Sequence, residues 1–139
     1  ALVVTDAVVD ANRAGTAFNL YPDLAAGATV TAAGAWAYGA YAQVAAAGPA
    51  AAYKVIGFSV DTPSAVGIYQ LEIATGAGAA EVEYAAVKFE IATDVGMLPF
   101  VYIHGGGVIA GATRLAARLA SAAGAAETMN VTLHTQEIA

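Results

Sequence analysis

Hydrophobic and polar residues alternate with a period of two along much of this chain, which is the pattern of a strand whose two faces differ. The clearest case is residues 53–60, where Tyr53, Val55, Gly57 and Ser59 alternate with Lys54, Ile56, Phe58 and Val60. A typical turn sequence, Asp61-Thr62-Pro63-Ser64, ends it. Further strands are predicted at residues 2–9, 28–47, 68–74, 81–91, 100–103 and 130–136. Turn signals about every eight to fifteen residues predict an all-β fold, a sandwich or a closed barrel.

Two regions interrupt this pattern. Residues 12–27 mix Gly15, Pro22 and Gly27 with large apolar residues, which predicts a long loop or arm rather than a regular element. Such a segment either caps the core of its own domain or reaches a neighbouring subunit, and the sequence leaves both open. The predicted organisation is therefore an N-terminal arm over residues 1–27 and a single β-sandwich domain over residues 28–139. Within the predicted strand at 28–47, Trp36 and Tyr38 share one face, and Gly39 and Ala40 then shift the phase before Tyr41, which predicts a bulge or kink.

Residues 114–120 are ambiguous between helix and strand. Leu115 and Leu119 lie four residues apart among alanines, which favours a helix by propensity. Alternation fits equally well, with the leucines on one face and Arg114 and Arg118 on the other. Physical reasoning alone does not separate the two.

The composition favours association with proteins over binding of nucleic acid or membrane. Hydrophobic residues make up 59% of the chain and charged residues 12%, so much of the surface must be weakly polar. Such surface is common inside interfaces, although genome composition explains alanine enrichment equally well. A net charge of −6 with five Lys and Arg residues offers no patch for phosphates. Residues 95–113 carry no formal charge but contain five glycines and Pro99, which predicts short strands instead of a membrane span.

No residue pattern predicts catalysis, a metal site or a cofactor site. His104-Gly105-Gly106-Gly107 matches the oxyanion motif of lipase-like enzymes, but the chain has no Gly-x-Ser-x-Gly sequence, so a glycine turn is the better interpretation. The two histidines, His104 and His134, lack metal-ligand spacing, and the chain has no cysteine. We therefore expect a protein that is not an enzyme. The aromatic residues Trp36, Tyr38 and Tyr41 could form a platform for a carbohydrate ligand, or they could belong to a core or an interface.

Several segments resemble a class of virion proteins from tailed phages. They are residues 36–44 (WAYGAYAQV), 55–60 (VIGFSV), 69–76 (YQLEIATG), 81–85 (EVEYA) and 111–121 (GATRLAARLAS). The resemblance covers residues 34–136 and does not extend to residues 1–27. It implies a jelly-roll-like antiparallel β-sandwich in which residues 114–121 form a strand.

The resemblance also implies a structural role in the virion, which is assembled in the host cytoplasm. The leading hypothesis is a capsid decoration (cement) protein, a homotrimer that binds the major capsid protein. The predicted contact residues lie in the arm: Leu2, Val4, Phe18, Leu20, Tyr21 and Leu24. The alternatives are a tail, fibre or carbohydrate-binding module that uses Trp36, Tyr38 and Tyr41, and a self-assembling filament subunit.

Overall fold

A computed structural model describes residues 17–23, 25–92 and 100–138. The described residues form strands and no helix, and every pairing between named strands is antiparallel. The strands are β1 (Phe18–Tyr21), β2 (Ala28–Thr31), β3 (Ala42–Ala45), β4 (Tyr53–Asp61), β5 (Gly67–Thr75), β6 (Val82–Ile91), β7 (Phe100–Tyr102), β8 (Leu115–Ser121) and β9 (Thr128–Glu137). This confirms the predicted all-β fold.

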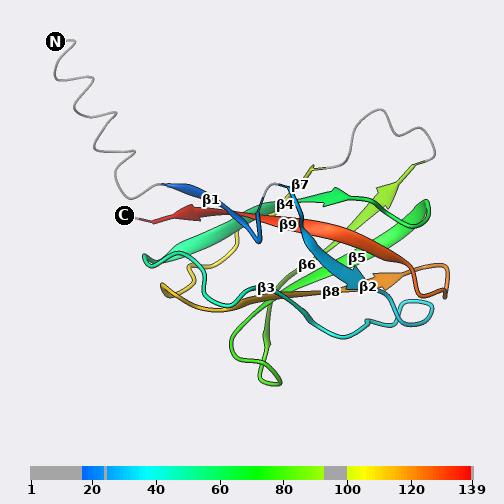
Figure 1. Cartoon of the computed structure of the whole chain (residues 1–139), viewed down its shortest axis with the longest axis horizontal. Coiled ribbons are helices and arrows are strands. Elements are labelled where there is room, and N and C mark those ends of the chain that lie inside the picture. Colours follow the sequence, from blue (N-terminus) through cyan, green and yellow to red (C-terminus); the bar gives the residue numbers. More distant parts are fainter. Residues whose placement is uncertain (1–16, 24, 93–99, 139) are drawn as a thin grey trace, which may run out of the picture.

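The strands form two sheets that pack against each other as a sandwich (Figure 1). The first, called the β9 sheet here, has the order β1-β9-β4-β7, and β2 also pairs with β9. The second, called the β8 sheet, has the order β3-β8-β5-β6. The antiparallel sandwich is therefore as predicted, while the jelly-roll connectivity stays a prediction.

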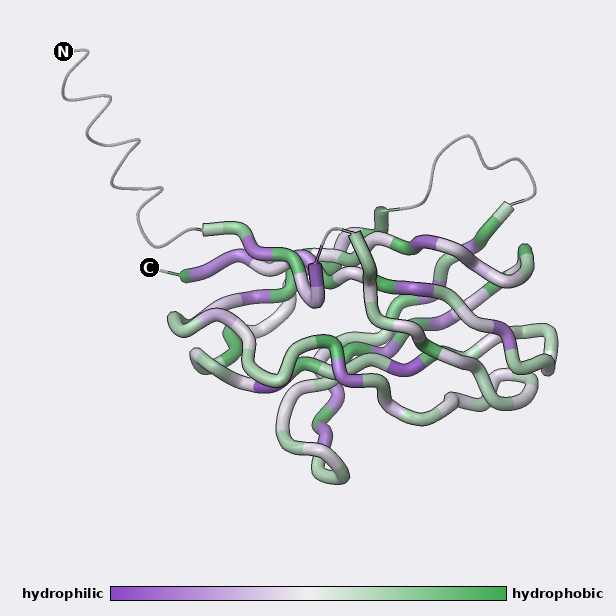
Figure 2. The backbone as a smooth tube through the Cα atoms, viewed as in Figure 1, coloured by the Kyte–Doolittle hydropathy of each residue, from purple (hydrophilic) through white to green (hydrophobic). Residues whose placement is uncertain are grey.

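The core lies between the two sheets and is built mainly from alternate residues of the strands. Figure 2 shows how hydrophobic and hydrophilic residues are interspersed along the chain. In β5, Tyr69, Leu71 and Ile73 are completely buried, while Gln70 faces outward. Burying a side chain of this size stabilises the fold by about 1.5–3 kcal/mol. The largest completely buried side chains are Tyr53, Tyr69, Phe58, Leu71, Ile73, Leu115, Leu119 and Leu133. The alternation in the sequence is therefore the direct cause of the two-layer architecture.

A bulge in β4 changes which of its residues face the core. The register of β4 against β9 shifts between Val55 and Gly57, so two residues of β4 oppose one of β9. Tyr53 and Val55 are buried before the bulge, and Phe58 and Val60 after it. The predicted face that combined Tyr53 with Ser59 is therefore wrong. The bulge brings Phe58 into the core. Its ring packs edge-on against the ring of Phe89, with the two ring centroids 5.4 Å apart.

The segment at residues 114–120 is a strand, as the resemblance implies. Leu115, Ala117 and Leu119 of β8 point into the core and are completely buried, while Arg118 points outward. A helix would leave β5 without its antiparallel partner over residues 69–75. Tertiary pairing and burial therefore outweigh the helical propensity of alanine.

Two other expectations about local structure are wrong. Residues 18–21 form strand β1, paired with residues 133–136 of β9, so the predicted loop over 12–27 contains a regular element. The predicted strand over 28–47 is two short strands, β2 and β3, and Trp36 and Tyr38 lie in the connection between them. Trp36 has a positive φ of 54°, which no strand position allows. The predicted strand at residues 2–9 lies outside the described residues.

Candidate interaction site

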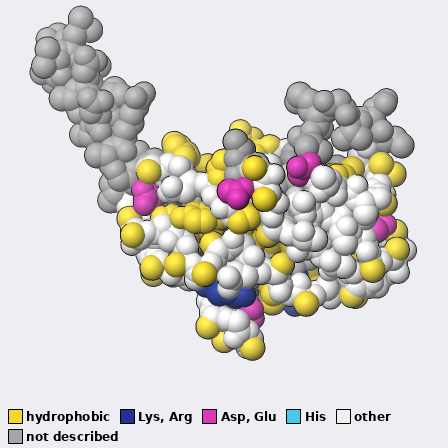
Figure 3. All heavy atoms as spheres, in the orientation of Figure 1, with side chains coloured by type: hydrophobic (Ala, Val, Ile, Leu, Met, Phe, Trp, Pro, Cys, Tyr) yellow, Lys and Arg dark blue, Asp and Glu magenta, His cyan; other side chains and the backbone are white. Residues whose placement is uncertain are grey.

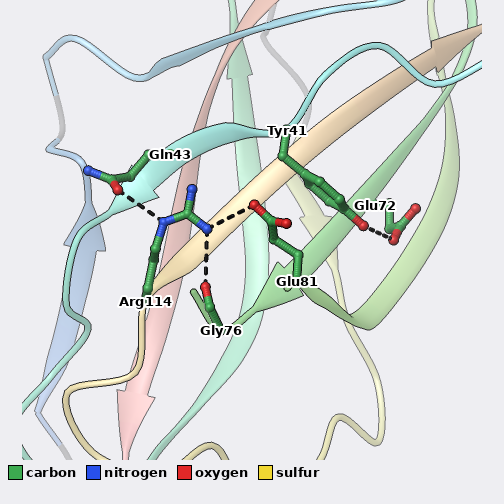
Figure 4. A network of polar contacts seen from close by, with 6 residues as sticks. All are labelled: Tyr41, Gln43, Glu72, Gly76, Glu81 and Arg114. Carbon is green, nitrogen blue, oxygen red and sulfur yellow. Dashed lines mark hydrogen bonds and ion pairs between the residues drawn. The ribbon is translucent and has the colours of Figure 1, made fainter. Parts of the chain in front are cut away.

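Arg118 is the centre of a polar and aromatic cluster on the outer face of the β8 sheet. Its Nη2 lies 2.6 Å from Oε2 of Glu72, and its Nε donates to the same oxygen at 2.7 Å. The guanidinium also lies 4.4 Å from the ring centroids of both Tyr38 and Tyr41. Tyr41 donates its hydroxyl hydrogen to Oε1 of Glu72 at 2.5 Å (Figure 4). We call these residues, with Gln70, which donates to the hydroxyl of Tyr38, the Arg118 cluster.

The register between β5 and β8 brings the charged residues of this cluster together. Glu72 of β5 lies directly opposite Arg118 of β8, so both side chains leave the sheet on the same side. The two tyrosines come from the connection before β3, which runs beside β8: the amide of Gly39 donates to the carbonyl of Leu119. Only 3% of Glu72 is exposed. A carboxylate buried this deeply requires its cation and its hydrogen bonds.

The cluster changes the proton affinity of its own members. Burial raises the pKa of Tyr41 to about 12, and its hydrogen bond to Glu72 and the charge of that carboxylate act in the same direction. The hydrogen bond to Glu72 raises the pKa of Arg118 above its ordinary value. Both shifts favour the same protonation state of the cluster, in which Tyr41 is neutral and Arg118 is charged.

A second arginine holds the neighbouring part of the same face together (Figure 4). Nη1 of Arg114 lies 3.1 Å from Oε1 of Glu81 and donates to the carbonyl of Gly76 at 3.1 Å. Its Nε donates to Oε1 of Gln43 at 3.0 Å. The backbone amide of Glu81 itself and then Arg114 hold the pKa of the Glu81 carboxyl below its usual range. Arg114 thereby ties β3 to the turn between β5 and β6.

Trp36 lies beside Lys88 of β6 on this side of the molecule. The ammonium nitrogen of Lys88 lies 4.5 Å from the centroid of the Trp36 ring, and 45% of Trp36 is exposed. Arg118, by contrast, stacks on the rings of Tyr38 and Tyr41. The three aromatic residues predicted as a ligand platform therefore occupy different environments: Trp36 is exposed, while Tyr38 and Tyr41 are half-buried. Their role in binding a carbohydrate stays a prediction.

The outer face of the β9 sheet has a different character, because its large side chains are aromatic and accessible. Phe100 and Tyr102 of β7 pack edge to face at 4.7 Å, and Phe100 packs against the ring of His134 at 4.6 Å. Exposure reaches 38% for Phe100 and 65% for Tyr102. Phe100 lies across Gly57, where a Cβ atom would come within 2.6 Å of its ring. We call Phe100, Tyr102 and His134 the aromatic face.

Two of the predicted contact residues lie on the same side of this sheet. Leu20 is paired with His134 and is half-buried, while Phe18 begins β1 with 68% of its surface exposed. Tyr21 instead packs against the core. Leu2, Val4 and Leu24 lie outside the described residues. The sequence prediction thus named Phe18 and missed the aromatic face, whose members come from two strands, β7 and β9, that are distant in the chain.

A serine–histidine pair within the β9 sheet does not form a catalytic arrangement with the described residues. Oγ of Ser59 lies 3.1 Å from Nε2 of His134, and burial lowers the pKa of His134. A nucleophile–base pair needs a third group to orient the base and donors for the developing oxyanion. Among the described residues no carboxylate hydrogen-bonds to His134, and no pocket opens at the pair.

The described residues also provide no cluster of three or more His, Cys, Asp or Glu side chains suited to a metal ion. In the same part of the chain, no helix is long and apolar enough to cross a membrane. Charged side chains are sparse in the view of Figure 3, and hydrophobic side chains reach the surface at many separate points. Comparisons with protein-family models, with curated proteins and with solved structures find no match to this chain. The exposed side chains of the two outer faces are therefore the basis for the function proposed below.

Proposed function

We propose that this protein is a structural subunit that works by associating with other proteins. The observation that carries the proposal is the exposure of Phe18, Phe100 and Tyr102 on one side of the β9 sheet. Large aromatic side chains with accessible surface are typical of the anchor residues of interfaces, because each buries much area at a low cost in side-chain entropy. The hydrophobic core between the sheets is formed by other residues, so these three rings are not part of it.

The most specific form of the proposal is a capsid decoration protein of a tailed phage. It binds the major capsid protein, associates as a homotrimer and is located in the virion. The resemblance of residues 34–136 to phage virion proteins supports this identity, and the weakly charged surface suits subunit contacts. The contact arm includes Phe18 and Leu20 of β1, followed by Tyr21 and Leu24, together with Leu2 and Val4.

The test replaces one exposed aromatic residue and measures attachment to particles. Phe18→Ser should reduce the amount of protein that co-sediments with purified capsids lacking it, because Phe18 offers the most exposed aromatic ring on that side. Val66→Ser, which removes another exposed hydrophobic side chain from the connection between β4 and β5, is the matched control and should bind normally. Equal occupancy of capsids by both variants and the native protein would refute the arm as the attachment site.

A second candidate function, a carbohydrate-binding module, is favoured by the accessibility of Trp36. Its ring is 45% exposed next to Lys88, and tryptophan rings commonly stack on sugars. Trp36→Ala should then abolish binding to a glycan array. An array on which the native protein finds no ligand would remove this candidate and leave the structural role.

A further inference from the structure

Strand β6 is the last strand of the β8 sheet and offers a long edge. Its ten residues, Val82–Ile91, are hydrogen-bonded to β5 on one side. Among the described residues, no other strand pairs with β6, and no further backbone hydrogen bond reaches it. An edge of this kind is a template for another strand unless something prevents pairing.

The hydrogen-bonding phase of the sheet shows which residues of β6 present this edge. The amide of Ala122 donates to the carbonyl of Ile68 at 3.0 Å, so the backbone groups of Ile68 point toward β8. Glu90 lies opposite Ile68, so their pair is one of those without hydrogen bonds between β5 and β6. The N–H and C=O of Glu90 therefore point away from the sheet. Since these directions alternate along a strand, those of Lys88 and Ala86 do so too.

The sequence around Phe89 is complementary to itself. In Val87-Lys88-Phe89-Glu90-Ile91, residues equally distant from Phe89 match in kind: two β-branched residues, and a cation with an anion. An antiparallel second copy centred on Phe89 would place Lys88 opposite Glu90 of that copy, twice by symmetry. Lys88 and Glu90 are both exposed on the outer face, while Phe89 packs toward the core in each copy.

The same register also satisfies the backbone. In this register, Lys88 and Glu90 of the second copy form a hydrogen-bonded pair. Both are residues whose N–H and C=O groups point away from the sheet, as such a pair requires. Moving the two-fold axis by one residue in either direction, which slides the strands past each other by two residues, places Lys88 opposite Lys88 of the copy or Glu90 opposite Glu90 of the copy. Both slides bring like charges together, so the charges select the register centred on Phe89.

We infer that β6 pairs with β6 of a second copy of this chain about a two-fold axis at Phe89. The two β8 sheets then form one continuous sheet through residues 87–91 of each copy. Charges on an edge strand often serve only to keep other strands away. Here they attract a second copy in one register, which is the opposite effect. The contact goes beyond the proposed capsid attachment, because it joins copies of the free protein and closes on itself.

The experiment measures the mass of the purified full-length chain by sedimentation over a wide range of concentration. We expect an even number of copies: two, or six if the proposed trimer also forms. Lys88→Glu and Glu90→Lys each put like charges opposite in the pair, so each should weaken self-association at least about tenfold. Glu83→Lys makes the same charge change on the same strand outside the paired residues and should leave the mass unchanged.

A mixture of the two single variants provides the decisive measurement. In the mixed pair, Lys88→Glu of one copy faces Glu90→Lys of the other, and the native Glu90 and Lys88 face each other at the second position. Both contacts are then between opposite charges, so the mixture should associate although each variant alone does not. The double variant, with both charges exchanged, should associate like the native protein. A monomer or a trimer at every concentration, or a mixture that stays dissociated, would overturn the pairing of β6. Capsid binding by Phe18→Ser is read separately, so the two proposals fail independently.

Discussion

The Arg118 cluster and the aromatic face lie on opposite outer faces of this sandwich and use their aromatic residues in opposite ways. On the β8 sheet, Tyr38 and Tyr41 are stacked on Arg118 and hydrogen-bonded, so their polar and apolar surfaces are already used within the chain. On the β9 sheet, Tyr102 has a neighbouring ring in Phe100 but leaves most of its own surface accessible. The Arg118 cluster is internally satisfied, and the aromatic face is not.

The difference separates residues that stabilise the fold from residues available to a partner. A buried ion pair costs desolvation energy, and it persists because removing one member is worse than keeping both. Exposed aromatic rings contribute little to the fold, since their burial is incomplete without another molecule. Substitutions within the Arg118 cluster should therefore lower the free energy of unfolding, and those of exposed rings such as Tyr102 should lower binding.

The largest expected effect follows from removing Arg118. Arg118→Ala leaves the buried carboxylate of Glu72 without its cation and removes the group on which two tyrosines stack. We expect a loss of about 3 kcal/mol in the free energy of unfolding, measured by urea denaturation. Glu83→Ala removes an exposed charge from the same sheet and should cost less than about 0.5 kcal/mol. Equal losses for the two variants would show that the Arg118 cluster is no more important than the open surface.

An intermediate effect is expected at Gly57, the position of the β9 face where packing is tight. A Cβ at this residue would lie 2.6 Å from both the ring of Phe100 and the carbonyl oxygen of Val101. Because the second of these is backbone, Gly57→Ala must displace β7 and should lower the free energy of unfolding by about 1–3 kcal/mol. Gly78→Ala, where no heavy atom lies within 4 Å, is the control and should change stability little. A neutral Gly57→Ala would mean that β7 is loosely held.

The sequence predicted the layers of this fold better than the faces. Period-two alternation located the strands at residues 53–60, 68–74, 81–91 and 130–136, because burial between two sheets imposes that period directly. It failed at the β4 bulge, because no particular residue type marks a bulge in the sequence. The extra residue reverses the direction of every later side chain in the strand. Phe58 was therefore expected on the wrong face relative to Val55.

The two candidate surfaces were less predictable, because each depends on contacts between residues far apart in the chain. Alternation placed Arg118 outward in a strand, yet nothing in the sequence paired it with Glu72 or placed two tyrosines on it. The aromatic face joins β7 to His134 through strand pairing that no local pattern encodes. Phe18 was identified because its neighbours lacked a regular pattern, and the structure places it on an exposed strand instead of a loop.

A small effect on stability is expected at Tyr102, where the comparison predicts that folding and binding separate. Tyr102→Ser removes a ring that is 65% exposed and should change the free energy of unfolding by less than about 0.5 kcal/mol. The same change should reduce association with a partner that covers the aromatic face, because an anchor ring is lost. Urea denaturation and co-sedimentation with capsids measure the two quantities. A variant that unfolds easily but binds normally would reverse the assignment of this face.

The smallest effect concerns pH and His134, the polar member of the aromatic face. Burial lowers the pKa of His134, so the folded protein binds its proton less readily than the unfolded chain does. As the pH falls below about 6.5, the unfolded state is protonated first, and the stability present at neutral pH decreases until the folded-state pKa is passed. Urea denaturation should show that the free energy of unfolding decreases more between pH 7.5 and pH 5 for the native protein than for His134→Gln. His104→Gln controls for the loss of a histidine from an exposed position. Identical decreases in all three proteins would mean that the ring of His134 is as well solvated as in the unfolded chain, and that Phe100 does not shield it.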